Sequence, residues 1–380
     1  MNDELKQAAI DLHERLHGKI HIQSRIDIAS MRDLSLMYTP GVGYVSSEIA
    51  EHPERADDLT WRKNAVAVVS DGTAVLGLGD IGPAAALPVM EGKCVIFKRF
   101  AGVNAVPIVL DTKDPDEIVR TVTAIAPGFG AIQLEDISAP RCFDIEERLI
   151  NELRIPVMHD DQHGTAIVVL AGLLNALKLA GKNIEHIRVV CSGAGAAGTA
   201  IAKLLLVVGV RRIILADRQG AIWEGRPGLN DEKRRLAAMT NPDKERGRLG
   251  DILRGADVLI GISGPGTVSE DMVASMNPQP IIFALANPVP EIMPDRARAA
   301  GAMLIATGRS DSPNQVNNAL CYPGLFRGML DHNVMRVTDD IKIRAARAIA
   351  AMVPDPTPER FIPSIFDDGL HTAVAASVRS

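Results

Sequence analysis

Apolar runs of strand length alternate with helical patterns along almost the whole chain, and no other pattern in the sequence restricts the fold class as strongly. The runs lie at residues 65–70, 105–110, 131–134, 155–158, 256–261, 280–287 and 302–308. Strands separated by amphipathic helices are typical of α/β proteins, in which crossover helices cover a parallel sheet. A chain of 380 residues with 47% hydrophobic residues can fill two cores. We therefore predict an α/β fold with two domains.

The charge pattern argues against nucleic acid and membranes as partners. The formal net charge is -6, and the charged residues are mixed along the chain, so no basic surface is predicted. The N-terminal segment MNDELKQ lacks the order of a secretory signal, and the longest uncharged apolar run, at 165–177, is too short to span a bilayer. The four cysteines lie far apart and form no C-x-x-C pair. These features predict a cytoplasmic protein that binds a small molecule.

Two pairs of acidic residues follow two consecutive predicted strands. Glu135 and Asp136 come directly after the run at 131–134, and Asp160 and Asp161 follow the run at 155–158. An amphipathic helical pattern between the runs predicts a βαβ unit, whose parallel strands end at the same edge of the sheet about 4.8 Å apart. Converging carboxylates need protons, a basic side chain or a hard divalent cation to neutralise them. Caps for the following helices are the alternative, but two adjacent pairs favour a metal site.

A second candidate site lies in the stretch from Ile187 to Asp217. A strand, the motif Gly193-x-Gly195-x-x-Gly198, a helix, a second strand and an acidic residue follow one another in that order. This order is typical of a dinucleotide-binding fold, in which the glycines let the backbone approach a pyrophosphate and the acid binds a ribose. The candidate cofactor-binding residues are Gly193, Ala194, Gly195, Ala196, Ala197, Gly198 and Asp217. The alternative is a glycine-rich turn selected only for close packing of helix and strand.

The boundary between the two predicted domains lies near His163. From this residue to Gly181 the sequence is apolar on most helical faces, which indicates a helix buried between two layers. We predict an N-terminal α/β domain at 1–162 that holds substrate and metal. A doubly wound, Rossmann-type domain with C-terminal helices is predicted at 163–380.

Several asparagines occur where predicted strands end or in the loop that follows the last strand. Asn287 ends the run at 280–287, and Asn317 and Asn318 lie in the later loop. Their amides could bind carboxylate or amide groups of a ligand. Asparagine also builds turns, so composition alone leaves both interpretations open.

Eight motifs, in order along the chain, together resemble the malic enzymes. They are MYTPGVG at 37–43, SDGTAVLGLGDIGP at 70–83, PVMEGK at 88–93, LEDI at 134–137, HDDQHGTA at 159–166, GAGAAG at 193–198, ANP at 286–288 and NNALCYPG at 317–324. The resemblance runs from about residue 20 to about residue 350 and is similar to the short bacterial form, without the phosphotransacetylase-like extension of some relatives. It implies oxidative decarboxylation of L-malate to pyruvate and CO2 with reduction of NAD or NADP.

The resemblance also implies roles for individual residues. Glu135, Asp136 and Asp161 would hold Mg2+ or Mn2+. Lys93 in MEGK matches the general base, with Asp160 close by to hold it, and Tyr38 in YTPG matches the acid that protonates C3 of enolpyruvate. The amides that match substrate-binding positions are those of Asn287 and Asn318, with Asn317 as a further candidate. Tyr38 and Lys93 are also the residues expected to touch substrate, and Asn287 is a candidate for cofactor contact. The family further suggests a homodimer.

Two features of the sequence leave specificity open. Larger family members bind substrate with an arginine at the position that corresponds here to Ala74, so another residue must bind the C4 carboxylate. Asp217 favours NAD, because a carboxylate accepts hydrogen bonds from a free ribose and repels a 2'-phosphate. Arg218 beside it could offset that repulsion. We expect NAD, with NADP as the alternative.

Two other functions are compatible with the same residues. A malolactic enzyme, which resembles this family, converts malate to lactate and retains its NAD. A regulatory module could keep the dinucleotide fold without catalysis. The presence of Tyr38, Lys93, Glu135, Asp136 and Asp161 together argues for an enzyme.

Overall fold

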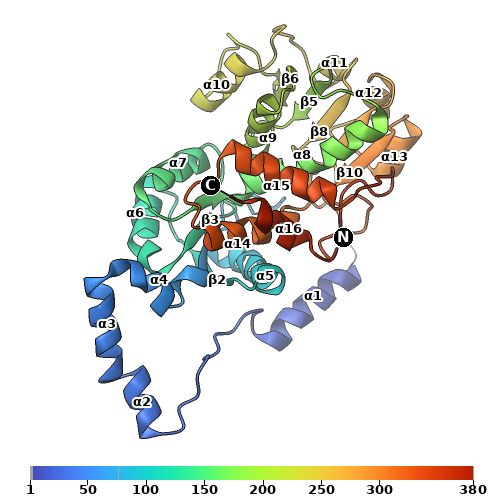
Figure 1. The fold of residues 1–380 in the computed structure, drawn as a ribbon. Coiled ribbons are helices and arrows are strands. Elements are labelled where there is room, and N and C mark those ends of the chain that lie inside the picture. Colours follow the sequence, from blue (N-terminus) through green and yellow to red (C-terminus); the bar gives the residue numbers. More distant parts are fainter. Residues whose placement is uncertain (1–2, 76, 380) are drawn as a thin grey trace.

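Two parallel sheets form the framework of the protein in the computed structural model, which describes residues 3–75 and 77–379 (Figure 1). The first sheet has the order β2-β1-β3-β4. Its strands are β1 (Ala65–Ser70), β2 (Asn104–Val109), β3 (Ala131–Leu134) and β4 (Val157–His159). The helices that connect them are α5 (Pro83–Ala101), α6 (Pro115–Ile125), the 3-10 helix η3 (Ala126–Gly128) and α7 (Arg141–Glu152).

The second sheet has the order β10-β9-β8-β5-β6-β7, and only the short β7 runs antiparallel to its neighbour. Its strands are β5 (Arg188–Ser192), β6 (Arg212–Asp217), β7 (Gly220–Ala221), β8 (Val258–Gly261), β9 (Ile281–Ala284) and β10 (Leu304–Thr307). The helices between them are α9 (Ala196–Val207), α10 (Asp231–Met239), α11 (Leu249–Leu253), α12 (Glu270–Ala274) and α13 (Pro294–Ala299). Strands β6 and β7 lie on one side of β5, and the chain then crosses to the other side of β5 to form β8, β9 and β10. The strand order therefore reverses between β5 and β8, and ligands bind at such a switch point in sheets of this kind.

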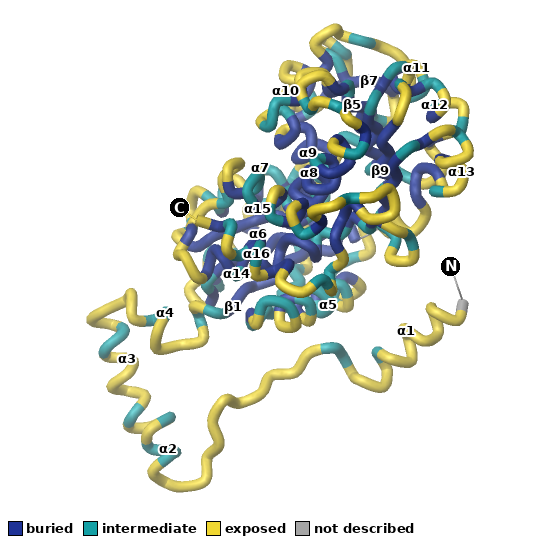
Figure 2. The backbone as a smooth tube through the Cα atoms, turned by 45° about the vertical axis from the view of Figure 1, so that its right-hand side comes forward, coloured by how far each residue is buried: buried dark blue, intermediate teal, exposed yellow. Residues whose placement is uncertain are grey.

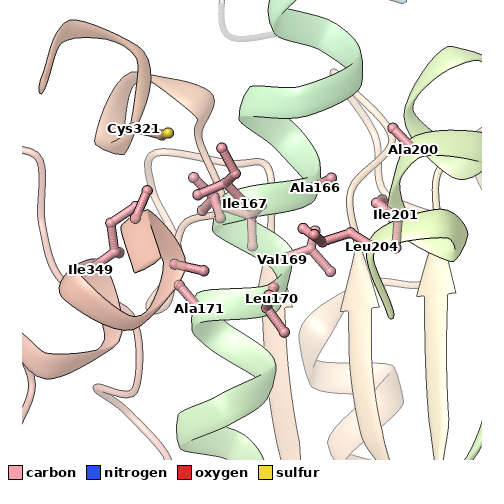
Figure 3. Packing of buried hydrophobic residues seen from close by; sticks show 14 of the residues in the cluster. Ala166, Ile167, Val169, Leu170, Ala171, Ala200, Ile201, Leu204, Cys321 and Ile349 are labelled. Atoms are coloured by element: carbon pink, nitrogen blue, oxygen red, sulfur yellow. The ribbon is translucent and has the colours of Figure 1, made fainter. Parts of the chain in front are cut away.

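Helix α8 (Asp160–Ala180) connects the two sheets and lies in the centre of the core. Figure 3 shows its apolar residues packed between Ile201 and Leu204 of α9 on one side and Ile349 on the other. Within the described chain it is the one helix long and apolar enough to cross a membrane, but 72% of its most apolar window is buried in the protein. Helix α8 is therefore a core helix, as its pattern predicted.

The C-terminal helices return to the first sheet. The 3-10 helix η4 (Asn318–Leu320) leads into α14 (Tyr322–His332), which is followed by α15 (Asp339–Ala351) and α16 (Leu370–Ser377). Helix α15 packs against α8, whereas α14 and α16 pack against each other and against α5 (Figure 1). The C-terminal segment thus covers elements of both sheets, and one apolar core runs between them without interruption.

The N-terminal residues project from this body. Helices α1 (Asp3–Leu16), α2 (Met31–Met37), α3 (Gly41–Glu51) and α4 (Ala56–Leu59) precede β1, with the 3-10 helices η1 (Pro53–Arg55) and η2 (Arg62–Asn64). Figure 2 shows α2 and α3 well away from both sheets, and their residues are exposed or intermediate, with none buried. We call residues 20–59 the N-terminal arm.

The predicted fold class is confirmed, because each apolar run forms a strand of a parallel sheet within two or three residues of its predicted ends. The division at residue 162 falls inside α8, whose first residues lie at the edge of the first sheet. That division stays a prediction.

Candidate active site

The two acidic pairs meet at one edge of the first sheet. Strands β3 and β4 are parallel neighbours, with Leu134 opposite His159, so the residues that follow them emerge side by side. Carboxylate oxygens of Glu135, Asp136 and Asp161 lie within 4.8 Å of one another. Their convergence was predicted from the order of the strands.

Backbone geometry fixes two of these carboxylates. Asp136 has a left-handed conformation (φ 54°). Its amide donates a hydrogen bond of 2.8 Å to Oδ2 of Asp161. Asp161 lies in the first turn of α8, where the helix dipole favours negative charge.

Lys93 of α5 reaches this edge from a different part of the chain. Its Nζ lies 2.7 Å from Oδ2 of Asp160 and 2.8 Å from Oε1 of Glu135. It also donates to Oδ1 of Asn318 at 3.1 Å and lies 4.8 Å from the centre of the Tyr322 ring. The lysine side chain is only 11% exposed, so it is a buried ammonium held by three elements.

Burial and charge act in opposite directions on these groups. Burial lowers the pKa of Lys93, but the carboxylates of Asp160 and Glu135 raise it, and the result is a pKa well above the usual value. Burial raises the pKa of Glu135 and that of Asp160, although the ammonium of Lys93 lowers both. The site thus holds an ammonium group and an excess of carboxylates.

The three converging carboxylates fit a hard divalent cation. All three donors are oxygen atoms, which Mg2+ and Mn2+ prefer, and two of the residues are buried. Asp160 belongs to the same cluster but turns its Oδ2 to Lys93. The cluster therefore divides into Glu135, Asp136 and Asp161 around a candidate metal site and Asp160 beside the lysine.

Buried groups behind the edge hold the acids in place, and the sequence analysis did not single them out. Gln133 donates to Oε2 of Glu135 at 2.7 Å. Glu146 of α7 accepts from the amide of His159 at 2.7 Å, from Gln162 at 3.0 Å, and lies 3.0 Å from Nε2 of His163. Burial raises the pKa of Glu146, but the charge and hydrogen bond of His163, together with His159, lower it below its usual value. The only sequence feature that could have identified Glu146 is its position as an acidic residue on the apolar face of α7.

The structure separates the candidate asparagines. Asn318 binds Lys93, whereas Oδ1 of Asn317 accepts from the amide of Ala319 at 2.9 Å and caps η4. Asn287 follows β9, and the backbone of Gly77 comes so close to it that a Cβ there would overlap the Asn287 carbonyl oxygen. The segments that follow β9 and β10 therefore reach the edge of the first sheet at Asn287 and Asn318. The side chain of Asn317 instead binds the backbone of its own segment.

Tyr38 is not brought to the site by its own chain. It lies at the C-terminal end of α2 in the N-terminal arm and is 65% exposed.

Ala74, by contrast, lies beside the candidate metal site, since its amide donates to the carbonyl oxygen of Asp136 at 2.9 Å. Its methyl group offers no donor to a substrate. Arg141 binds the same loop through Asp71 and Thr73, both at 2.9 Å.

The glycine motif lies at the switch point between β5 and β8. Gly193 has a φ of 127°, and a Cβ on it would strike the carbonyl oxygen of Ile262 after β8. A Cβ on Gly198 would strike the carbonyl oxygen of Gly193, whereas a Cβ on Gly195 would meet open space. The first and third glycines therefore allow close packing, and the second leaves room in front of α9. Ala194 lies in this turn, and Ala196 and Ala197 begin α9.

Asp217 ends β6, but two cations that the sequence analysis missed already bind it. Its Oδ2 lies 2.5 Å from Nη2 of Arg226 and 2.7 Å from Nζ of Lys233. Burial raises the pKa of Asp217, but these hydrogen bonds lower it to about 2. Arg218 follows directly in sequence. The expected ribose site is thus a carboxylate surrounded by positive charge.

Comparisons with known proteins point to one family. The family model described as "Malic enzyme, N-terminal domain" matches residues 17–150, and that described as "Malic enzyme, NAD binding domain" matches residues 162–378. The chain is 54% identical to the bifunctional malic/malolactic enzyme of Bacillus subtilis over 98% of this chain and 92% of that protein. It is 55% identical to the NAD-dependent malic enzyme of Geobacillus stearothermophilus over 95% and 76%.

Solved structures agree. The NAD-dependent malic enzyme of Thermotoga maritima superposes with a TM-score of 0.95 at 48% identity, covering 98% of this chain and 99% of that one. The malic enzyme of Entamoeba histolytica gives a TM-score of 0.94 at 40% identity, covering 98% and 80%.

Proposed function

Because this chain belongs to the malic enzyme family, we propose that it oxidises L-malate and decarboxylates the product to pyruvate and CO2 while reducing NAD. The observation that carries the proposal is the contact of Lys93 with Asp160 and Glu135 at the carboxyl edge of the first sheet. It joins a candidate base to a candidate metal site across which a 2-hydroxy acid can bind.

Glu135, Asp136 and Asp161 would hold Mg2+ or Mn2+ at this edge. When bound, such a cation supplies the Lewis acid that lowers the pKa of the C2 hydroxyl of malate and stabilises the enolate left by loss of CO2. The burial of Glu135 and Asp136 excludes water from these carboxylates, which strengthens their interaction with a cation.

Lys93 would take the proton of the C2 hydroxyl as hydride leaves C2 for the nicotinamide ring. Asp160 accepts a hydrogen bond from its Nζ and so fixes the direction in which the amine faces. The lysine must lose a proton before it can act. Binding of Glu135 to a cation would remove one of the two carboxylates that keep Lys93 charged, and so favours the basic form.

Tyr38 would supply the proton that C3 of enolpyruvate takes up after the C3–C4 bond breaks. Asn287 and Asn318 would bind the substrate carboxylates through their amides, and Asn317 is the weaker candidate because it caps η4. The donor for the C4 carboxylate is not Ala74, since an alanine has none.

The coenzyme would lie across the ends of β5 and β8. Gly195 and the first turn of α9 would hold the pyrophosphate by backbone amides. Asp217, ionised at neutral pH, would accept hydrogen bonds from a free ribose, which favours NAD. The positive charges of Arg218, Arg226 and Lys233 would attract the 2'-phosphate of NADP, so NADP is tested in parallel.

A malolactic reaction is the second candidate, because a relative 54% identical to this chain is named a bifunctional malic/malolactic enzyme. In that reaction malate gives lactate and the coenzyme is not released in reduced form. Release of reduced coenzyme separates the two activities.

The test is absorbance at 340 nm with L-malate and Mn2+, with NAD and NADP in parallel. We expect malate-dependent reduction with equimolar pyruvate, faster with NAD. Lys93→Ala and Asp161→Asn should each lose at least about 100-fold in kcat, the usual range for removal of a general base or a ligand of the catalytic metal.

Exposed residues of the same types provide controls. Lys113→Ala and Asp144→Asn change a lysine and an aspartate outside the site and should keep wild-type rates. Wild-type protein that reduces neither coenzyme would contradict oxidative decarboxylation. Lactate in the same reaction would then favour the malolactic alternative, and neither product would favour a non-catalytic dinucleotide-binding module.

A further inference from the structure

One glutamate after β9 is completely buried without a cation to neutralise it. The exposed fraction of Glu291 is 0%. Among the described residues, no lysine, arginine or histidine forms an ion pair with it. A buried carboxylate without a counter-charge is costly, and the catalytic scheme above gives this one no role. Its surroundings indicate what the charge does.

Backbone amides of two loops hold the carboxylate. The amide of Ser263, two residues after β8, donates to Oε1 of Glu291 at 2.8 Å. The amide of Ala286, two residues after β9, donates to Oε2 at 3.1 Å. Burial raises the pKa of Glu291 above its usual value, and hydrogen bonds from backbone amides offset this only in part. These partners are all donors, so they favour the ionised form of the carboxyl group.

The carboxylate is packed against the end of β8, next to the glycine motif. A Cβ on Gly261, the last residue of β8, would lie 2.6 Å from Cδ of Glu291. In the loop that follows, Oγ of Ser263 lies 3.0 Å from Oγ of Ser192, the last residue of β5. Glu291 therefore lies at the switch point, on the side of β8 and β9.

This position indicates which half of the coenzyme lies nearby. Asp217 follows β6, on the opposite side of β5, and is the residue expected at the adenosine ribose. A dinucleotide crosses the switch point, so its nicotinamide half lies over the ends of β8 and β9. Ser263 and Asn287 are exposed in the loops there, and Glu291 binds the backbone of both loops from the buried side. The buried charge is thus beside the reacting end of the coenzyme.

The nicotinamide ring is the part of the coenzyme whose charge changes in the reaction. The ring is a cation in NAD and is neutral in NADH, whereas the adenosine and the pyrophosphate are the same in both. A fixed negative charge of the protein therefore attracts the oxidised ring more strongly than the reduced one. Arg309, which reaches the carbonyl oxygen of Pro288 in the loop after β9, does not cancel this charge, because it is paired with Asp311.

We propose that Glu291 is the charge by which the coenzyme site prefers the oxidised coenzyme to the reduced one. This inference rests on the proposed function, which places a nicotinamide coenzyme at the switch point. Attraction between Glu291 and the cationic ring holds NAD before hydride transfer, and loss of that attraction favours release of NADH afterwards. Release of reduced coenzyme separates the malic reaction from the malolactic one, so Glu291 favours the malic reaction.

The test is coenzyme binding by the full chain without malate. Isothermal titration calorimetry gives the Kd of NAD, NADH and ADP-ribose for the wild type and for Glu291→Gln, which keeps the shape of the side chain but not its charge. Glu291→Gln should weaken NAD by about 3- to 10-fold and leave NADH and ADP-ribose within about 2-fold. ADP-ribose lacks the nicotinamide ring, so its Kd reports whether the glycine turn and Asp217 are still in place.

Two further variants separate charge from packing. Glu270→Gln removes the charge of a glutamate at the start of α12 whose side chain is 47% exposed, and all three Kd values should stay unchanged. Glu291→Asp keeps the charge on a shorter side chain, so the ratio of the NADH and NAD Kd values should stay within about 2-fold of the wild type. Circular dichroism and melting temperature show whether each variant is folded, and Glu291→Asp decides the question if Glu291→Gln is not.

Equal weakening of NAD and NADH in Glu291→Gln would overturn the proposal, because it would show that the carboxylate only holds the two loops together. An unchanged affinity for NAD in this variant would overturn it too. The same holds for a Kd ratio in Glu291→Asp that departs from the wild type by more than about 3-fold, since that variant retains the charge. Failure of the proposed function is distinct, because wild-type protein would then reduce no coenzyme with malate, whatever its affinity for NAD and NADH.

Discussion

At the residue scale, the site is dominated by charge. One ammonium group, that of Lys93, interacts with the carboxylates of Asp160, Glu135 and Asp161, and Asp136 adds a fourth carboxylate beside Glu135. Burial makes each uncompensated carboxylate costly, so the excess of negative charge is a strong argument for a divalent cation at this edge. Glycines in the same segment show how closely the site is packed.

Gly164 is expected to be required for the position of Asp160. A Cβ at this position would overlap Oδ1 of Asp160 and come 3.1 Å from Cβ of Asn318. Gly164→Ala should therefore displace the partner of Lys93 and lower kcat by about 10-fold or more, because small misplacements of catalytic groups are costly. Steady-state kinetics with malate measures the loss.

Gly128→Ala is the matched control, since a Cβ there meets nothing within 4 Å. If Gly164→Ala keeps the wild-type kcat, the contact between Lys93 and Asp160 does not position the base.

Asp217 should control the choice between NAD and NADP. Its removal leaves Arg218, Arg226 and Lys233 without the carboxylate that neutralises two of them. Asp217→Ala should lower kcat/KM for NAD and raise it for NADP, changing their ratio by about 10-fold or more, about 1.4 kcal/mol. The ratio is measured with both coenzymes at saturating malate.

Asp231→Ala, which removes an exposed aspartate at the start of α10, should leave the ratio unchanged. An unchanged ratio in Asp217→Ala would mean that the ribose does not reach the end of β6.

At the element scale, single helices connect the site to the core. Helix α8 begins with two acids of the site and continues as a buried helix. Asn175, in the C-terminal half of α8, donates to the carbonyl oxygens of Ala350 at 2.9 Å and Phe361 at 3.1 Å. The position of the carboxylates therefore depends on the packing of α15. Helix α16 completes the layer over α5 and contains a buried histidine.

His371 of α16 should make stability depend on pH. Its ring is buried against Phe100 at 4.8 Å, and burial lowers its pKa from 6.5 to about 4. The unfolded chain therefore binds a proton that the folded chain excludes between these values. This contribution is fully present above pH 6.5 and is lost as the pH falls toward 4, on the order of 2 kcal/mol after allowance for partial solvation of the ring.

Chemical denaturation of the wild type and His371→Phe at pH 7 and pH 4.5 measures the effect. The variant should lose less stability between the two values, because phenylalanine keeps the ring contact and cannot bind a proton. His332→Gln, at an exposed position at the end of α14, should behave like the wild type. Equal losses in His371→Phe and the wild type would exclude His371 as the source.

At the scale of the whole molecule, the site is assembled from segments far apart in the sequence. Lys93 lies on α5, and its partner Asn318 is 225 residues away in η4, before α14. The core that surrounds α8 extends from the first sheet to the second, so the two sheets form one packed body in which both sites are held.

A divalent cation should stabilise the whole protein. Ligands that bind only the folded state raise stability, by about 2.7 kcal/mol at a concentration 100 times the Kd. Mn2+ should raise the melting temperature of the wild type, and EDTA should reverse the increase. Asp161→Asn should abolish most of it, whereas Asp144→Asn, at an exposed position on α7, should keep it. The same increase in Asp161→Asn would place the cation elsewhere.

The sequence by itself determined the elements and the edges at which they end. Apolar runs between amphipathic helices specify parallel strands, and parallel strands bring the acids of 135–136 and 160–161 together whatever the rest of the chain does. The spacing of Gly193, Gly195 and Gly198 likewise specified the turn after β5, because these requirements are local.

Only the tertiary structure decided which polar side chains meet. Nothing near Lys93 in the sequence predicts that it binds Asn318, or that Asn317 caps a helix while its neighbour enters the site. Arg226 and Lys233 reach Asp217 by loop and helix packing, and Glu146 of α7 reaches the amide of His159 at the end of β4. The exposure of Tyr38 also depends on where the arm lies. Such contacts depend on distances between elements, which packing of the complete core sets, and local sequence pattern carries no information about them.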